Sequence, residues 1–295
     1  MDTILTIVKL LGGLGLFIYG MKLMGDGLEN AAGEGLKKIL EKVTKNPLIG
    51  VIVGAVVTMV IQSSSATTVM VVGFVNAGLM NLAQAAGIIM GANVGTTVTA
   101  QLVAFKLDDI APIFVFVGAM MVMFVKGKRR REIGSIILGF GILFVGMGTM
   151  SEAMKPLTSS PIFQDILTTV GSHWYLGLIA GALKAVIVLG RYSVLSVLVG
   201  VIITAIVQSS SATTGILVAL ATAGALNINE ALPIIMGCNI GTCITAMLAT
   251  VGTNKTAHRA AMLHLIFNVV GTIIFLPIIV PGFLGRFVSY FSSDV

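Results

Sequence analysis

The chain has 295 residues, of which 56% are hydrophobic and only 10% are charged, and its mean hydropathy is +1.04. Soluble domains carry about 25% charged residues, so this composition excludes an ordinary soluble protein and predicts a polytopic membrane protein. The net charge of +6 does not indicate a nucleic-acid partner, because the basic residues lie in predicted loops. Apolar runs of about 20 residues favour membrane helices over the alternating segments of a β-barrel.

The first predicted elements are a membrane span over residues 3–24 and an interfacial helix over residues 33–45. The N-terminus lacks a basic leader and a small-residue cleavage site, so we expect an uncleaved span and no signal peptide. In the second segment, Leu36, Ile39 and Leu40 share one helical face while lysines occupy the others. This pattern is typical of a helix that lies in the membrane interface.

The next segment, 47–79, is apolar at both ends and carries the heptapeptide QSSSATT (Gln62 to Thr68) in its middle. Each apolar arm is only about 14 to 16 residues long, whereas a membrane crossing needs about 20. Two complete crossings are therefore disfavoured. The pattern predicts a re-entrant hairpin with its tip at Ser63 to Ser65.

Two further spans are predicted over 82–104 and 110–125. The first contains the cassette GANVGTTVTA (Gly91 to Ala100), whose glycines and polar side chains predict a helix that is unwound in the middle. The second leads to the basic run KGKRRR at 126–131. One span, one hairpin and two more spans make three crossings, and an odd number inverts whatever unit follows.

The same pattern recurs 146 residues later. QSSSATT returns at Gln208 to Thr214, and GCNIGTCITA at Gly237 to Ala246 matches the first cassette. We therefore predict an all-α membrane fold of two inverted-topology repeats, residues 1–131 and 132–295. The second repeat is expected to contain a span over 133–151, an insert over 173–191, a hairpin over 194–226, a broken span over 231–251 and a span over 257–280.

The positions of the basic residues predict the orientation of these segments. The basic run at 126–131, the lysines at 37–45, and Lys255 with Arg259 fall on one side, provided that the insert over 173–191 does not cross the bilayer. The positive-inside rule makes that side cytoplasmic and places the N-terminus outside.

The two cassettes and the two heptapeptides contain no Asp, Glu, Lys or Arg. All 12 acidic residues of the chain lie in predicted loops, termini or helix ends. Serine hydroxyls and half-helix N-termini favour an anion such as phosphate or a carboxylate, and carboxamide and hydroxyl oxygens suit sodium. The phosphate-binding candidates are Ser63, Ser64, Ser65, Thr67, Ser209, Ser210, Ser211 and Thr213. The sodium-binding candidates are Gln62, Asn93, Thr96, Thr97, Gln208, Asn239 and Thr242.

Other chemistries fit the pattern less well. A single serine run in a membrane helix usually serves packing, but repetition at one register argues against that here. Cys238 and Cys243 have Ala92 and Thr97 as counterparts, so we expect packing residues and no transition-metal site. His258 and His264 are expected to be interfacial or satisfied histidines. No His, Asp or Glu accompanies the serines, so the pattern does not predict an enzyme.

The paired QSSSATT motifs and G-x-N-x-G-T cassettes resemble those of the type II sodium-dependent phosphate cotransporters and their bacterial relatives. The resemblance covers residues 12–280 and implies inorganic phosphate as substrate, sodium as the coupling ion, alternating access and no other cofactor. It also implies a multi-pass protein of the cell membrane, the inner membrane in bacteria, surrounded by membrane lipid.

The resemblance also bears on the partners of the protein. Many bacterial relatives carry a C-terminal PhoU-like domain, whereas here the chain stops about 15 residues after the last predicted span. A separate PhoU-like regulator therefore stays open as a partner, and so does a homo-oligomer.

Two other functions remain open. One alternative function is a sodium-coupled carboxylate transporter, although the cassettes contain no Arg for the carboxylate. Another is an ion channel, which would need a continuous polar path.

Overall fold

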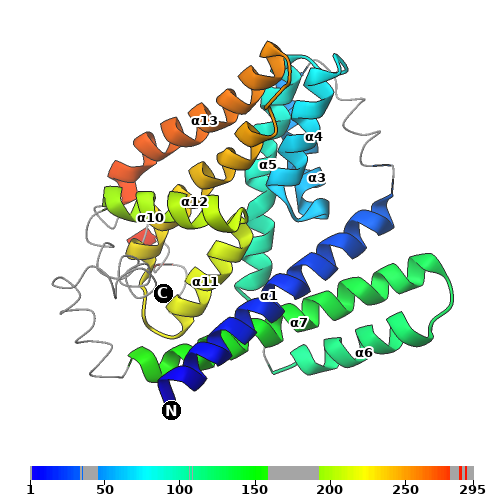
Figure 1. Ribbon diagram of the computed structural model, residues 1–295, viewed down its shortest axis with the longest axis vertical. Coiled ribbons are helices and arrows are strands. Elements are labelled where there is room, and N and C mark those ends of the chain that lie inside the picture. Colours follow the sequence, from blue (N-terminus) through cyan, green and yellow to red (C-terminus); the bar gives the residue numbers. More distant parts are fainter. Residues whose placement is uncertain are drawn as a thin grey trace. The chain divides into compact units, whose positions relative to one another are not determined.

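The computed structural model describes residues 2–33, 35, 46–105, 107, 109–158, 193–279, 286–287 and 290. These residues form helices and connecting turns, without strands (Figure 1). Most of the interfacial helix predicted over 33–45, and the whole insert at 173–191, lie outside the described residues. The helices are α1 (Asp2–Ala32), α3 (Pro47–Ile61), α4 (Ser64–Asn76), α5 (Leu82–Val103), α6 (Ala111–Phe124), α7 (Lys128–Thr158), α10 (Ser193–Val207), α11 (Ser210–Thr222), α12 (Ile228–Leu248) and α13 (Lys255–Ile279).

Five of these helices, namely α1, α5, α7, α12 and α13, are long and apolar enough to cross a membrane. The prediction of a multi-pass, all-helical membrane protein is therefore confirmed. Helix α6 has 14 residues, fewer than the roughly 20 that an untilted span needs, so its crossing over 110–125 stays a prediction.

The arms of both predicted hairpins form short helices. Helices α3 and α4 have 15 and 13 residues, as do α10 and α11. Asn46 caps the start of α3 by accepting a hydrogen bond from the Leu48 amide (3.0 Å), and Pro47 occupies the first turn, where its missing N–H does no harm. In each pair a glutamine and a serine separate the two helices.

The prediction that residues 82–104 and 231–251 contain broken helices is wrong. Helices α5 and α12 run without interruption through both cassettes. The glycines serve helix packing instead. A Cβ atom at Gly91 would collide with the Val51 carbonyl oxygen of α3, and one at Gly237 would collide with the Val197 carbonyl oxygen of α10. Small residues let two backbones approach this closely in a membrane.

The chain divides into two compact units, each built from separate stretches of sequence. One contains residues 11–149 and 243–267, and the other contains 1–10, 150–242 and 268–295. In the first unit, α3 and α4 lie beside α5 (Figure 1), and their core includes Val57, Val72 and Ile88. In the second unit, the corresponding core around α10, α11 and α12 includes Leu217, Leu220 and Ile234.

Candidate functional site

The turn between α3 and α4 has an uncommon backbone conformation. Gln62 adopts the left-handed region (φ 59°, ψ 21°), and its amide donates to the Thr58 carbonyl (2.7 Å), which ends α3. Ser63 is extended and caps α4, its Oγ accepting from the Ala66 amide (3.1 Å). A left-handed residue other than glycine costs on the order of 1–3 kcal/mol and persists only where its surroundings hold it, often at a functional site.

Buried side-chain hydrogen bonds hold this turn in place. Thr58 donates from its hydroxyl to Thr67 Oγ1 (3.0 Å), and Thr67 in turn donates to the Ser63 carbonyl (3.1 Å). The Gln62 carboxamide accepts from the Thr99 hydroxyl of α5 (2.8 Å) and donates to the Met59 carbonyl. Both ends of the turn are thereby fixed to each other and to α5.

The turn between α10 and α11 repeats this geometry. Gln208 is also left-handed (φ 56°), and Ser209 Oγ accepts from the Ala212 amide (3.2 Å). Thr204 donates to Thr213 (3.2 Å), and Thr213 donates to the Ser209 carbonyl (3.1 Å). The two turns differ in exposure, because the Gln62 side chain is buried and the Gln208 side chain is exposed.

Four of the eight predicted phosphate ligands make hydrogen bonds within the turns, and these four divide into two groups. Ser63 and Ser209 accept backbone hydrogen bonds, and each keeps its own O–H proton to donate. The first-turn amides of α4 and α11 have no helix carbonyl within reach, and they carry the partial positive charge of the helix end. Thr67 and Thr213 are fully buried and their hydroxyls lock the turns, so a ligand role for them stays a prediction.

Thr68 carries a buried hydroxyl without a hydrogen-bond partner among the described residues. Its side chain is fully buried, four residues after Ser64 on the same helix. Leaving such a group unsatisfied costs about 1–3 kcal/mol. An ion or an oxyanion held at the turn is one partner that would remove this cost.

The predicted sodium ligands on α5 and α12 mostly make local hydrogen bonds. Thr96, Thr97 and Thr242 donate to carbonyls three or four residues earlier in their own helices, which leaves lone pairs on their oxygens for a cation. Asn93 lies 3.3 Å, Oδ1 to Nε2, from the fully buried His264 of α13, and Asn239 is exposed. The side-chain bond from Gln62 to α5 is made by Thr99, a residue outside the predicted set.

The predicted site residues did not include Thr58 and Thr99, which hold the first turn, or His264, which contacts Asn93. Thr58 and Thr204 share the 146-residue offset of the repeat, which is a usable signal. Gly95 is where α5 packs against α3. Thr99 follows Gly95 by one helical turn, so this spacing indicates that the Thr99 side chain lies on the face of α5 that is turned toward α3. His264 has Gly118 at the corresponding position, so the repeat gives no signal for it.

Comparison with known proteins agrees with the repeated motifs. A family model described as Na+/Pi-cotransporter matches residues 16–152 and 181–288. "Uncharacterized protein YqeW" of Bacillus subtilis is 32% identical over 280 residues, which cover 94% of this chain and 83% of that protein. "Putative inorganic phosphate export protein YjbB" of Escherichia coli K12 is 30% identical over 275 residues, covering 93% of this chain and 47% of that protein.

A mammalian relative matches over a shorter stretch. "Sodium-dependent phosphate transport protein 2A" of Rattus norvegicus is 36% identical over 103 residues, which cover 34% of this chain and 16% of that protein. No solved structure matches the chain. The chain spans about half the length of the YjbB proteins that it matches. With the family model matching both halves of the sequence, the chain belongs to the Na+/Pi-cotransporter family.

Proposed function

We propose that this protein moves inorganic phosphate across the membrane together with sodium ions, by alternating access. The observation that carries the proposal is the pair of helix turns at Gln62–Ser63 and Gln208–Ser209. Both turns have a left-handed glutamine, a serine that caps the next helix, and a buried threonine whose hydroxyl donates to the carbonyl of that serine. The names of two relatives, a phosphate export protein and a sodium-dependent phosphate transporter, support the choice of substrate.

The chemistry of the turns explains why sodium would be needed. Serine hydroxyls and first-turn amides donate hydrogen bonds to an anion, but neither heptapeptide and neither cassette contains Lys or Arg. A phosphate buried there without a counter-charge would lose its hydration without full compensation. Sodium held by nearby carboxamide and hydroxyl oxygens supplies the missing charge, so each ligand favours binding of the other.

The electrical work of moving charge across the membrane constrains the number of sodium ions taken up with each phosphate. Moving one charge across 100 mV corresponds to about 2.3 kcal/mol, so importing a phosphate dianion against a cell-negative potential costs about 4.6 kcal/mol. Two sodium ions cancel this electrical work, and a third makes import electrogenic. Phosphate export would reverse the sign of the electrical work.

We further propose that the chain forms two inverted repeats whose hairpins, 47–79 and 194–226, enter the membrane from opposite sides. This topology requires the end of α4 and the turn before α13 to lie on one side. Asn254 supports it by donating from its amide to Asn76 Oδ1 (2.9 Å) and from its carboxamide to the Asn76 carbonyl (2.9 Å). The end of α1 and the start of α7 are likewise joined, Asn30 donating to Glu132 (3.3 Å).

Cysteine labelling tests this topology. Ala77 and Ala223 occupy equivalent positions at the ends of the two hairpins, 146 residues apart. We expect Ala77→Cys to react with an impermeant maleimide from the cytoplasmic side and Ala223→Cys from the other side. The native cysteines, Cys238 and Cys243, are buried, so background labelling should be low. Labelling of both variants from one side would rule out inverted hairpins.

Flux measurements test the transport proposal. Radiolabelled phosphate uptake into proteoliposomes should follow an imposed sodium gradient and should fall to background when potassium or choline replaces sodium. Uptake that is equally fast without sodium would remove the coupling and favour a channel. A carboxylate that competes with phosphate and is itself accumulated would favour the carboxylate alternative.

Replacing Thr68 with valine separates a ligand role from a packing role. Valine keeps the shape of threonine but removes the buried hydroxyl, so we expect the thermal unfolding midpoint of purified protein to stay equal or to rise. Phosphate uptake should fall several-fold if the hydroxyl contacts a ligand. The matched variant Thr214→Val changes a half-buried counterpart. Undiminished uptake in Thr68→Val would exclude Thr68 from the site.

A further inference from the structure

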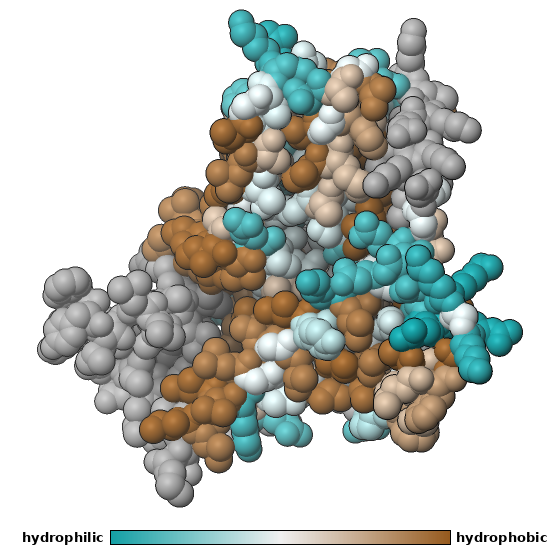
Figure 2. Space-filling view, turned by 45° about the vertical axis from the view of Figure 1, so that its right-hand side comes forward, coloured by the Kyte–Doolittle hydropathy of each residue, from teal (hydrophilic) through white to brown (hydrophobic). Residues whose placement is uncertain are grey.

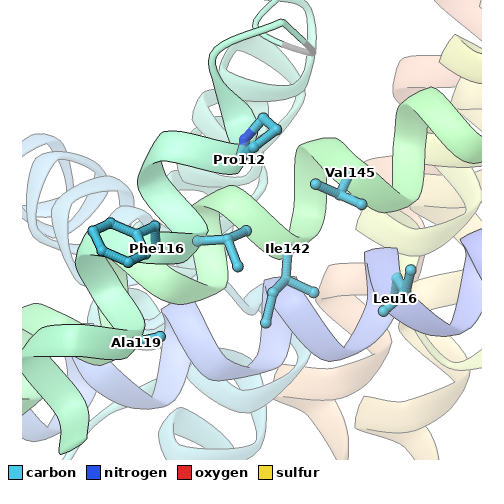
Figure 3. A pocket seen from close by; sticks show the side chains of 7 residues that line it. Leu16, Pro112, Phe116, Ala119, Ile142 and Val145 are labelled. Atoms are coloured by element: carbon cyan, nitrogen blue, oxygen red, sulfur yellow. The ribbon is translucent and has the colours of Figure 1, made fainter.

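We propose that the protein binds an anionic phospholipid on α6 and α7, with the headgroup at the basic turn between them and an acyl chain in an apolar pocket beside them. The pocket has a volume of about 520 Å³. Figure 3 shows side chains from three helices around it: Leu16 from α1, Phe116 and Ala119 from α6, and Ile142 and Val145 from α7.

The lining of the pocket selects the chemistry of its occupant. Its seven lining residues are all apolar, so a polar ligand would lose its hydrogen bonds to water without replacement. Leu16 and Phe116 are 40% and 64% exposed, which opens the pocket to the surroundings of the helices. In a membrane-spanning protein those surroundings are hydrocarbon, and a methylene chain fills such a groove without any polar cost.

The basic turn supplies the second, independent observation. Lys126, Lys128 and the three arginines 129–131 are all exposed. Within 126–132 the acidic residue is Glu132, which is half-buried and accepts a hydrogen bond from Asn30. The turn therefore presents a surplus of positive charge. On the lower right of Figure 2, a hydrophilic region directly borders hydrophobic surface. Basic clusters at the end of a membrane helix attract anionic lipid headgroups.

The nearer part of the pocket lies at a depth that a lipid anchored at this turn can reach. Helices α6 and α7 are antiparallel and in close contact, since a Cβ at Gly134 would lie 2.7 Å from Met121 Cβ. At about 1.5 Å per residue, Ala119 and Ile142 lie roughly 10 and 20 Å along the helices from the turn. One leaflet of the hydrocarbon core is about 15 Å thick. The pocket therefore begins at Ala119 within the leaflet next to the turn and extends past the middle of the bilayer at Ile142, so an acyl chain whose headgroup lies at the turn reaches its nearer part.

The charge also decides between a lipid and a second copy of the chain. A two-fold symmetric interface over this face would bring two copies of the same basic turn close together. Like charges at such an interface repel, whereas an anionic lipid neutralises them. The positive turn therefore favours the lipid.

Lipid binding can be measured by native mass spectrometry of the full chain. We expect dioleoyl phosphatidylglycerol to be retained about tenfold more strongly than dioleoyl phosphatidylcholine. The double variant Arg129→Gln/Arg130→Gln should lose most of this preference. The matched control Lys255→Gln/Arg259→Gln, which removes two other exposed basic residues, should keep it. Equal retention of the two lipids by the unmodified protein would overturn the proposal.

A second variant tests the pocket separately from the charge. Ala119→Trp places a large side chain in the pocket and should weaken retention of both lipids, whereas the exposed Gly73→Ala on α4 should not. Full phosphatidylglycerol retention in monodisperse Ala119→Trp protein would show that surface charge alone binds the lipid and would overturn the pocket assignment. If Ala119→Trp is not monodisperse, Val145→Phe replaces it with the same two outcomes. Excess inorganic phosphate should not displace the lipid, which separates this site from the proposed transport site.

Discussion

Alanine at Gln62 or at Gln208 should reduce sodium-dependent phosphate uptake by about tenfold or more. A hydrogen bond to a charged ligand contributes about 1.5–3 kcal/mol, which corresponds to roughly one to two orders of magnitude in rate. Each glutamine lies at the left-handed position between two short helices. The measurement is radiolabelled uptake into proteoliposomes, normalised to reconstituted protein. Gln101→Ala, at an exposed position beyond the first cassette, is the matched control and should transport normally.

The two glutamines should differ in their effect on stability. Gln62 is only 8% exposed and accepts from Thr99, so Gln62→Ala leaves a buried hydroxyl with one partner fewer and should lower the thermal unfolding midpoint. Gln208 is exposed, and Gln208→Ala should leave that midpoint nearly unchanged. Wild-type uptake in both variants would mean that the turns are purely structural.

Leucine at Gly91 is expected to prevent folding of the first unit. A single Cβ at this position already collides with the Val51 carbonyl, and the next contact along the helix is also too close, since a Cβ at Gly95 would lie 2.7 Å from Thr58 Cβ. Overpacking usually costs about 1–3 kcal/mol, and a rigid backbone opposite the new side chain raises that cost. We expect no monodisperse protein after extraction. Gly237→Leu should behave alike, because Gly237 meets the Val197 carbonyl in the same way.

A glycine without close neighbours provides the control. Gly73 on α4 has no atom within 4 Å of the position that its Cβ would take. Gly73→Ala should therefore fold normally and gain about 0.5–1 kcal/mol from the higher helix propensity of alanine. A wild-type melting curve for Gly91→Leu would show that α3 and α5 are not held at the distance described.

Much of the fold could be predicted because its signals are local or repeated. Apolar arms of about 15 residues are too short to span a membrane, and the arms at 47–61 and 64–76 are indeed short helices. The prediction of broken helices was wrong because glycine in a membrane helix can mark either a break or a close contact with a neighbouring helix, and here Gly91 and Gly95 make such contacts with α3. Gly87, Gly91 and Gly95 recur every four residues, a spacing that indicates close packing against a neighbouring helix.

The candidate site was less predictable because its supporting contacts join distant parts of the chain. The serine caps follow from the heptapeptide itself, since serine before a helix is a local signal. The bond from Thr99 to Gln62 joins residues 37 positions apart, and the contact of His264 with Asn93 joins residues 171 positions apart. A single sequence carries no local signal for such pairs.

The first repeat does not enclose its own core. Buried residues of α4, such as Val71 and Val75, share one apolar cluster with Ala257 and Ala260 of α13. Asn254 both donates to Asn76 at the end of α4 and caps α13 by accepting from the Ala257 amide (2.9 Å). A polypeptide ending at residue 131 would leave this side of α4 uncovered. The two halves, produced as separate chains, should accordingly accumulate in the membrane only when they are made together.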